Sequence, residues 1–192
     1  LEHKRLPDSC ARPELIETHI SWVILTDNFA FKIKKPNHYS FLDFSTLDKR
    51  RFYCERELEL NRRLAPDIYL EVLPIYAEQG TYAIGEPPED AVIVDFVLKL
   101  KKLSPERRMD LLLEKEEVTA LPVLQIAEQL AAFHEANRLK GVEPNVLEMQ
   151  DDFADILKLK NFITAHLGDR AMRVIERSVK YSQRFLYQYE ER

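Results

Sequence analysis

Lys32 and Glu57 are the two residues of this 192-residue chain whose types and spacing best suit chemistry. Lys32 lies in an apolar, strand-like run, and side-chain alternation places it on one face together with Ala30 and Lys34. A lysine on the inner face of a sheet needs an anion, because an unpaired buried charge costs several kcal/mol. The alternative is an edge strand whose lysine face is solvated.

Glu57 is the glutamate that helical geometry selects from the charged segment of residues 47–64. It belongs to a stripe at positions i, i+4, i+7 and i+11, formed by Tyr53, Glu57, Leu60 and Leu64. A carboxylate in such a stripe needs a cation, and Lys32 is the natural partner. A lysine and a glutamate placed in this way can hold the phosphates of a nucleotide. The alternative is an ordinary helical pair between Glu57 and a neighbouring arginine.

The charge around these two residues favours an anionic ligand. Residues 29–63 contain nine lysine and arginine residues against five acids, although the whole chain carries a formal net charge of -5. This local surplus of positive charge suits a polyphosphate, and a solvated helix face is the alternative. The acidic balance of the whole chain argues against a dedicated nucleic-acid binder.

Other classes of function are excluded by composition. No apolar run approaches the roughly 20 residues that span a bilayer, and no secretory segment opens the chain. Cys10 and Cys54 are therefore expected to be reduced thiols in a cytoplasmic protein. The five histidines show no metal-ligand spacing with these cysteines, so we expect no metal site.

The sequence patterns that must position these residues predict an α+β fold. A loose leader is expected over residues 1–13, a sheet with one helix over 14–103, and helices alone over 104–192. The first region combines a helix at 47–64 with strands expected at 15–18, 22–25, 30–34, 69–77, 81–84 and 91–100. Ser104 and Pro105 then open a helix, and three apolar stripes follow, within residues 123–134, 153–163 and 172–189.

Four segments carry a resemblance to a known family. They read IETHISWV at residues 16–23, AFKIKKP at 30–36, FLDFSTL at 41–47 and ELELNRRLAP at 57–66. Together they resemble the N-terminal lobe of the aminoglycoside-phosphotransferase-like family, and in particular its uncharacterised bacterial branch that is often fused to a P-loop ATPase domain. The likeness is looser over residues 94–100 and 127–134.

The resemblance implies a protein-kinase-like N-lobe, formed by an antiparallel sheet and one helix, followed by the helices of a partial C-lobe. ATP would bind between the lobes. Lys32 would hold its α- and β-phosphates, and a glycine-free turn near residue 20 would cover them with help from side chains. Val23 and Ala30 would contact the adenine, and backbone groups near residues 98–101 would form the hinge. The implied nucleotide-binding residues are Lys32, Glu57, Ser21, His19, Val23, Ala30, Leu98, Lys99 and Leu100.

The catalytic part of this family's pattern is absent from the sequence. Transfer of a phosphoryl group in this fold needs a catalytic-loop Asp, an Asn five residues later and a second Asp for Mg²⁺. The segment that ends at Asp169 has one residue too many, and Val174 stands where the Asn belongs. Asp152 precedes any catalytic loop. We therefore assign no catalytic residue and no metal ligand, and expect Mg²⁺ only with a catalytic segment beyond Arg192.

Two functions follow as expectations. The first is the ATP-binding portion of a small-molecule, aminoglycoside-type phosphotransferase-like protein whose acceptor is unspecified. The alternative is a non-catalytic, pseudokinase-like interaction or scaffold module that uses its C-terminal helices. Its partner would be a second copy of the chain, as a homo-oligomer, or a fused ATPase domain. Neither function involves nucleic acid or a membrane.

Overall fold

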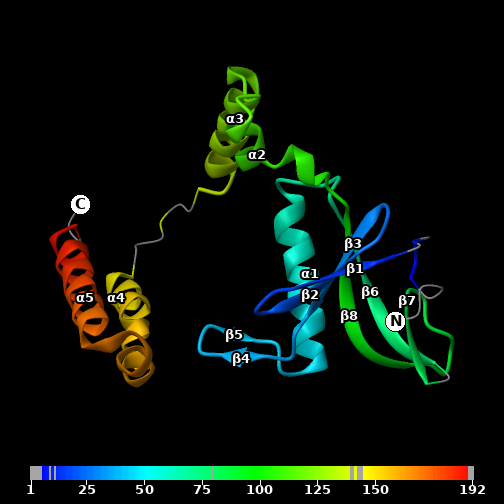
Figure 1. The fold of residues 1–192 in the computed structure, drawn as a ribbon, viewed down its shortest axis with the longest axis horizontal. Coiled ribbons are helices and arrows are strands. Elements are labelled where there is room, and N and C mark those ends of the chain that lie inside the picture. The colour runs from blue at the N-terminus through cyan, green and yellow to red at the C-terminus, as the bar shows by residue number, and fades with distance from the viewer. Residues whose placement is uncertain are drawn as a thin grey trace. The chain divides into compact units, whose positions relative to one another are not determined.

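The computed structural model describes residues 6–8, 10, 12–78, 80–138, 141 and 145–189. The chain divides into two units, Leu1–Ala136 and Asn137–Arg192. The first combines a sheet with helices, and the second is helical, which gives the α+β class (Figure 1). Residues 104–136, which the sequence patterns group with the later helices, belong to the same unit as the sheet.

A six-stranded antiparallel sheet forms the centre of the first unit. Its strand order is β1-β2-β3-β8-β6-β7, so the third and last strands lie side by side in the middle. All six strands lie within a few residues of their expected positions: β1 (Glu14–Glu17), β2 (Ser21–Leu25), β3 (Phe29–Lys34), β6 (Tyr69–Glu78), β7 (Thr81–Ile84) and β8 (Val92–Lys101). Two further strands, β4 (His38–Tyr39) and β5 (Leu42–Asp43), form a separate hairpin. Each has only two residues, which is too short for the sequence pattern to indicate a strand.

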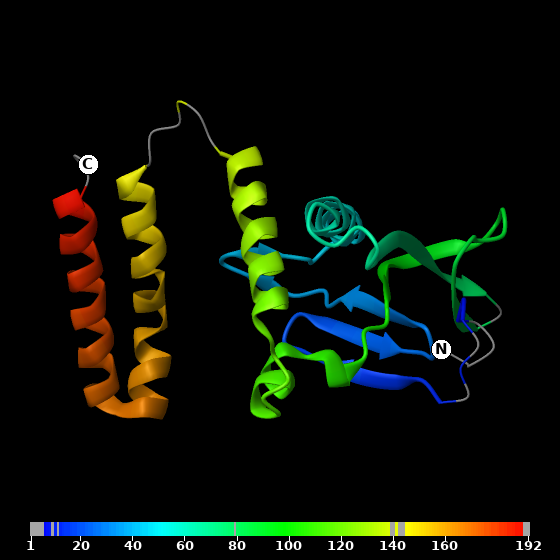
Figure 2. The same cartoon turned by 90° about the horizontal axis from the view of Figure 1, so that it is seen from above.

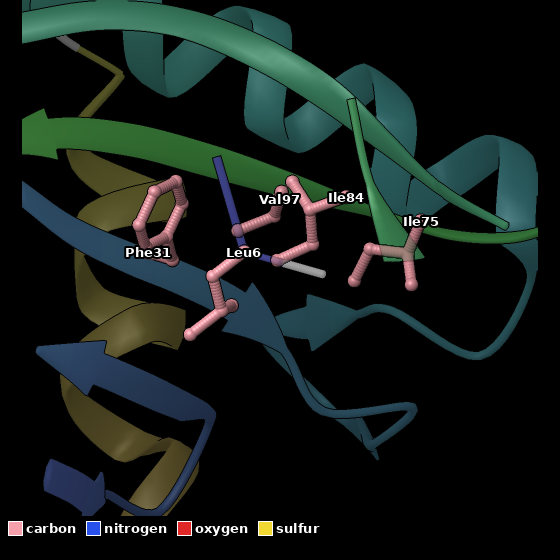
Figure 3. Close-up of a cluster of buried hydrophobic side chains, with 5 residues drawn as sticks. All are labelled: Leu6, Phe31, Ile75, Ile84 and Val97. Carbon is pink, nitrogen blue, oxygen red and sulfur yellow. The ribbon is translucent and has the colours of Figure 1, made fainter. Parts of the chain in front are cut away.

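The main hydrophobic cluster lies on one face of this sheet (Figure 3). Phe31 and Val97 are fully buried on the two central strands. Ile75, Ile84 and Leu6 complete the cluster, each less than a tenth exposed. Leu6 comes from the segment expected to be a loose leader, so this part of the chain contributes to the core.

A second contact ties the N-terminal segment to the sheet. The Asp8 carboxylate accepts hydrogen bonds from the Thr26 hydroxyl at 2.6 Å and from the backbone N–H of Asn28 at 3.0 Å. These partners form the turn between β2 and β3. Residues 1–5, 9 and 11 of the expected leader lie outside the described residues.

Helix α1 (Leu47–Arg62) connects β5 to β6 and packs against β6 and β8. It begins where the Thr46 side chain, as the N-cap, accepts a hydrogen bond from the N–H of Lys49. It ends before Pro66, as the restriction on residues preceding proline requires. Figures 1 and 2 both show the helix lying across one face of the sheet.

Three helical segments follow the sheet within the first unit: η2 (Pro105–Arg107), α2 (Met109–Glu114) and α3 (Ala120–Ala136). None of the residues of α3 is buried, although the helix is rich in leucine, valine and isoleucine. It contacts the end of α1 through two side chains. Gln129 donates a hydrogen bond to the Leu64 carbonyl at 2.9 Å, and the Arg63 guanidinium lies 5.0 Å from the centre of the Phe133 ring.

The second unit contains α4 (Val146–Ala154), η3 (Asp155–Leu159) and α5 (Lys160–Tyr189). Gly168 interrupts α5 with φ 79° and ψ 169°, and the chain reverses there into a helical hairpin (Figures 1 and 2). An ion pair of 3.2 Å between Lys160 and Glu176 joins positions eight residues before and after the reversal. The hairpin buries Val146, Ile163, Met172 and Val179.

The apolar stripe expected over residues 172–189 therefore packs inside this hairpin at Met172 and Val179. The Tyr189 side chain, its last expected member, lies outside the described residues. Among the described residues, no helix is long and apolar enough to cross a membrane.

Candidate functional site

Strand β3 presents Lys32 and Lys34 on the face opposite the hydrophobic cluster. Phe31 points into that cluster, so alternation sends Lys32 and Lys34 to the other side. The strand is central, because β2 pairs with one edge of it and β8 with the other. The alternative of a solvated edge strand is therefore wrong, and Lys34 is only 5% exposed.

The carboxylate of Glu57 lies between these two lysines. The Lys32 ammonium donates to Oε1 at 2.8 Å, and the Lys34 ammonium donates to Oε2 at 2.6 Å. Both carboxylate oxygens are thus engaged in charge-assisted hydrogen bonds. The pair expected between Lys32 and Glu57 is present, and the second lysine is an addition that the sequence analysis did not assign.

The three side chains differ in their access to solvent. The side chain of Lys32 is 31% exposed, whereas those of Glu57 and Lys34 are 18% and 6% exposed. Lys32 is therefore the member of the cluster that can reach a ligand. Lys34 is enclosed, and its ammonium also lies 4.8 Å from the centre of the Phe44 ring, a cation–π distance.

Burial and hydrogen bonding act in opposite directions on Glu57. Burial raises the pKa of its carboxyl, but hydrogen bonds and charge attraction from Lys32 and Lys34 outweigh burial and leave the pKa below its ordinary value. Glu57 is therefore a carboxylate at neutral pH. A carboxylate that serves as a fixed counter-ion needs this state.

A second ion pair lies under the same helix. The Arg50 guanidinium donates to Asp95 on β8 at 2.8 Å and to the Phe44 carbonyl at 3.2 Å. Cys54 lies between the two pairs on α1, fully buried, and burial raises the pKa of its thiol to about 11. The inward stripe of α1 thus combines the polar residues Arg50, Glu57 and Asn61 with the small apolar Cys54.

Of the expected stripe, Glu57 faces the sheet, and Tyr53 and Leu60 are half-buried. Leu64, expected inside, is 37% exposed. Helix α1 docks on the sheet largely through charges, so hydrophobic periodicity identified only part of its inner face. The signal that could have revealed the second pair is Asp95, an acid within the apolar run of β8.

Cross-strand register shows which other expected site residues share the face of Lys32. Val23 and Leu98 are the direct neighbours of Lys32 on β2 and β8. Ala30 faces Leu100 one step along the same face. Six of the nine implied nucleotide-binding residues therefore line one surface of the sheet, namely Ser21, Val23, Ala30, Lys32, Leu98 and Leu100.

The hinge expected near residues 98–101 lies inside strand β8. Leu98, Lys99 and Leu100 pair with β3 on one side and with β6 on the other. Their backbone is committed to the sheet, and the Lys99 side chain pairs with Glu71 on the opposite face at 2.9 Å. Backbone beyond the strand begins after Lys101.

A cavity of about 560 Å³ opens where β8 ends. Its lining is cationic at four positions and combines the segment after β8 with one residue from the loop before β6: Ile68, Lys101, Lys102, Leu103, Ser104, Arg107 and Arg108. The position expected for a hinge thus adjoins a hollow.

The turn between β1 and β2 is held by side-chain hydrogen bonds. The Thr18 hydroxyl accepts from the N–H of Ser21 and donates to its carbonyl, both at 3.0 Å. Asn37 donates to the His19 carbonyl at 3.0 Å. The His19 side chain is exposed, whereas Ser21 is 1% exposed and faces Lys34 across the strands.

The sequences that imitate catalytic motifs lie in the helical hairpin of the second unit. Gly168 makes the chain reversal, and Nδ1 of His166 lies 2.9 Å from the Phe162 carbonyl of its own helix. Asp152 lies within α4. In the described part of the chain, no group of three or more His, Cys, Asp or Glu side chains could hold a metal ion.

The arrangement around Lys32 can bind an anion without performing covalent chemistry. It offers one partly exposed ammonium group, a fixed counter-ion behind it and an apolar surface beside it. No nucleophile paired with a general base accompanies these groups among the residues described above.

Comparisons with known proteins add relatives of undetermined function. The chain is similar to "Uncharacterized protein Rv2004c" and "Uncharacterized protein MT2060" of Mycobacterium tuberculosis and to "Uncharacterized protein Mb2027c" of Mycobacterium bovis. Each is 37% identical over 124 residues, which cover 62% of this chain and 22% of the relative. The match thus spans about a fifth of the length of these relatives. No family model matches the chain. No solved structure matches it significantly.

Proposed function

We propose that the first unit binds the phosphates of ATP at Lys32, as part of a small-molecule phosphotransferase-like protein. The observation that carries this proposal is the Lys32–Glu57 ion pair of 2.8 Å between a central strand and the helix that follows it. A lysine and a glutamate in these two positions are the parts that protein kinases use to hold nucleotide phosphates.

The order of the strands supports the proposal. The chain runs through β1, β2 and β3, forms α1, and returns to the sheet as β6 and β8, with β8 next to β3. A protein-kinase-like N-lobe has this arrangement of five antiparallel strands and one helix. Hairpin strand β7 is an addition at the edge beside β6.

The chemistry of the site fits a polyphosphate. Two ammonium groups share one carboxylate, so the cluster keeps a net positive charge, and its most exposed member is Lys32. Val23, Ala30 and Leu98 give the same face an apolar surface that suits a nucleobase. ATP supply would place such a protein in the cytoplasm.

Transfer to an acceptor is assigned to no residue of this chain. ATP supplies a transferable phosphoryl group, whereas the residues described here bind and orient. We propose that the parent activity is phosphorylation of a small-molecule hydroxyl, with Mg²⁺ and the catalytic loop supplied by sequence outside residues 1–192.

Calorimetric titration with Mg-ATP tests the assignment. Wild-type protein should bind, and Lys32→Met should weaken binding at least about tenfold, because it removes the only partly exposed ammonium of the cluster. Lys49→Met is the matched control, since Lys49 also pairs with an acid, Asp43, but stands at the start of α1. Equal binding of Mg-ATP by wild type and Lys32→Met would contradict the assignment of the site to Lys32.

A second candidate function is an interaction or scaffold module. The helical hairpin carries an apolar cavity of about 370 Å³ lined by Met149, Phe153, Tyr181, Ser182, Phe185 and Leu186. Exposed aromatic groups at such a surface favour contact with another protein chain. Two partners suit the proposal, a second copy of this chain or a fused ATPase domain.

Light scattering over a hundredfold range of concentration separates the two functions. A rise in mass with concentration that Tyr181→Ser abolishes supports self-association through the hairpin. A monomer at every concentration removes the homo-oligomer from this candidate. Neither outcome alters the expected binding of ATP by the first unit.

A further inference from the structure

Lys34 is a buried lysine that the proposed phosphate contact does not use. Its side chain is 6% exposed, and its ammonium contacts Oε2 of Glu57 at 2.6 Å and the face of the Phe44 ring at 4.8 Å. Lys32 already supplies a cation to the other oxygen of Glu57. The second lysine therefore needs a reason of its own, because enclosing a charge costs free energy.

The charge balance of the cluster supplies that reason. A single lysine paired with a single glutamate is neutral and attracts an anion weakly. Here two ammonium groups share one carboxylate, so the cluster has one excess positive charge. Lys32 is the more exposed of the two lysines, so a ligand can reach this charge there. A low-dielectric surrounding strengthens this charge, because less water screens it.

We propose that Lys34 is a positioning residue of the nucleotide site, which holds Glu57 from behind and leaves Lys32 free to bind phosphate. This inference rests on the proposed function of the site. When an anion reaches Lys32, Glu57 keeps a partner at 2.6 Å and is not left as an uncompensated buried charge. The site is thus assembled before the ligand arrives.

The surroundings of Glu57 leave this task to Lys34. The charged groups nearby are Lys32 and Lys34 on β3 and the Arg50–Asp95 pair, and the thiol of Cys54 on the same helix is a further titratable group. Arg50 is committed to Asp95, and Cys54 is a neutral thiol at neutral pH because burial raises its pKa. Asn61 contacts Glu57 only at the backbone carbonyl, at 2.8 Å.

Calorimetry with Mg-ATP on three variants tests the role. Lys34→Met keeps the length of the side chain and removes its charge, so binding should weaken about tenfold although Lys32 is intact. Lys34→Arg restores the charge and should bind within about threefold of wild type. Unchanged binding by a folded Lys34→Met protein overturns the proposal.

Lys35→Met is the matched control. Lys35 is the next residue, and it also combines a carboxylate, Glu17 at 2.5 Å, with an aromatic ring, that of Trp22 at 5.4 Å. Lys35 follows the end of β3, and its partner Trp22 lies opposite Ile33, on the face away from Lys32. The Lys35→Met variant should therefore bind ATP within about twofold of wild type. If Lys35→Met weakened ATP binding as much as Lys34→Met does, the proposal would also be overturned. The loss of binding would then not be specific to the position of Lys34.

Nuclear magnetic resonance of the Glu57 side-chain carbon separates failure of this inference from failure of the proposed function. Without nucleotide, Lys34→Met should raise the pKa of Glu57 more than Lys32→Met does, because Lys34 is the more enclosed partner. An equal or smaller effect overturns the role of Lys34, whether or not ATP binds. If the wild-type protein binds no ATP but the pKa of Glu57 rises more in Lys34→Met than in Lys32→Met, only the proposed function is contradicted.

The wild-type protein offers a test that needs no variant to fold. The Lys34 ammonium should exchange its protons slowly with water, because it is enclosed between Glu57 and Phe44. Lys49, whose side chain is 45% exposed, should exchange rapidly. Fast exchange at Lys34 would contradict the enclosed contact on which the inference stands.

Discussion

Arg50 on α1 and Asp95 on β8 form an ion pair of 2.8 Å beneath the helix, 45 positions apart in the chain. Their side chains are 10% and 19% exposed. Glu57 makes a further ion pair between the same helix and the sheet, at the neighbouring strand β3. Helix α1 thus forms one ion pair and one three-residue cluster with the sheet, and each suggests a measurement.

Removing Arg50 should destabilise the first unit strongly. Arg50→Met leaves Asp95 as a poorly compensated charge, and breaking an enclosed pair in this way costs about 3–5 kcal/mol. Urea unfolding followed by circular dichroism measures the loss. The double variant Arg50→Met/Asp95→Leu should recover part of it, because both charges are then gone.

Arg56→Met is the control for this prediction. Arg56 pairs with Glu59 on the exposed side of α1, with a side chain 47% exposed, so its loss should cost about 0.2–1 kcal/mol. A cost for Arg50→Met within that range would show that the Arg50–Asp95 pair does not fix the helix.

The Glu57 cluster should make stability depend on acid. The pKa of Glu57 is lower in the folded protein than its ordinary value of 4.5. Its contribution to the free energy of unfolding is therefore fully present above about pH 4.5 and is lost as the pH falls through the folded-state pKa. Urea unfolding between pH 3 and pH 7, measured at steps of roughly half a pH unit, follows this loss of stability.

Glu57→Gln should flatten part of this profile, because the variant has no carboxyl to protonate at that position. The comparison of slopes below pH 4.5 isolates Glu57 from the other acids of the chain, which both proteins share. Identical slopes would mean that Glu57 is not held as a carboxylate by its two lysines.

A side chain at Gly168 should destabilise the helical hairpin. The φ of 79° with ψ of 169° at this residue is a conformation that essentially only glycine adopts. Gly168→Ala should therefore destabilise the hairpin by about 1–3 kcal/mol, although nothing lies within 4 Å of the added Cβ. Hydrogen exchange of the amides on both sides of the reversal measures the change.

Arg170→Ala serves as the comparison, since Arg170 is exposed and lies two residues further along α5. Alanine suits a helix at least as well as arginine, so exchange should stay nearly unchanged. Equal protection in Gly168→Ala and wild type would show that the chain does not reverse through this backbone conformation.

The sequence predicted the strands because alternation and turn residues are local signals. The strand expected at residues 81–84 has the boundaries of β7, and the helix expected at 47–64 is α1, which ends two residues earlier. The pairing of Lys32 with Glu57 could also be predicted, since a strand period and a helix period each placed one residue on an inner face. These inferences need no knowledge of distant contacts.

The burial of Lys34 could not be predicted in the same way. Whether β3 is an edge or a central strand depends on β8, which pairs with it from more than sixty residues further along the chain. The polar stripe of α1 depends likewise on Asp95 of β8. Periodicity of apolar residues does not report charges that are buried in pairs.

The break at Gly168 shows a related limit. Apolar stripes on both sides of it continue a helical pattern, so the stripes alone do not locate the reversal. Glycine at a helix end is a known signal, but the four glycines of the chain all adopt positive φ, and only one of them reverses a helix. Ile163 before the break and Met172 after it are both buried, and local sequence does not report such burial.

Cys54 offers a test of how closely α1 packs on the sheet. Its side chain is fully buried, whereas Cys10 is partly exposed. Burial also raises the pKa of the Cys54 thiol to about 11, so at pH 8 very little of the reactive thiolate is present. A colorimetric thiol reagent should therefore detect one fast thiol in the native protein and the second only on unfolding.

Variants assign the two phases. Cys10→Ser should remove the fast phase, and Lys34→Met in that background should speed the reaction of Cys54 if loss of the Glu57 contact loosens the helix. The charge effect alone acts in the opposite direction, because Lys34 lowers the pKa of Cys54 and its removal leaves less thiolate. Faster reaction in the variant would therefore report motion of α1, whereas two fast thiols in the wild type would contradict the burial of Cys54.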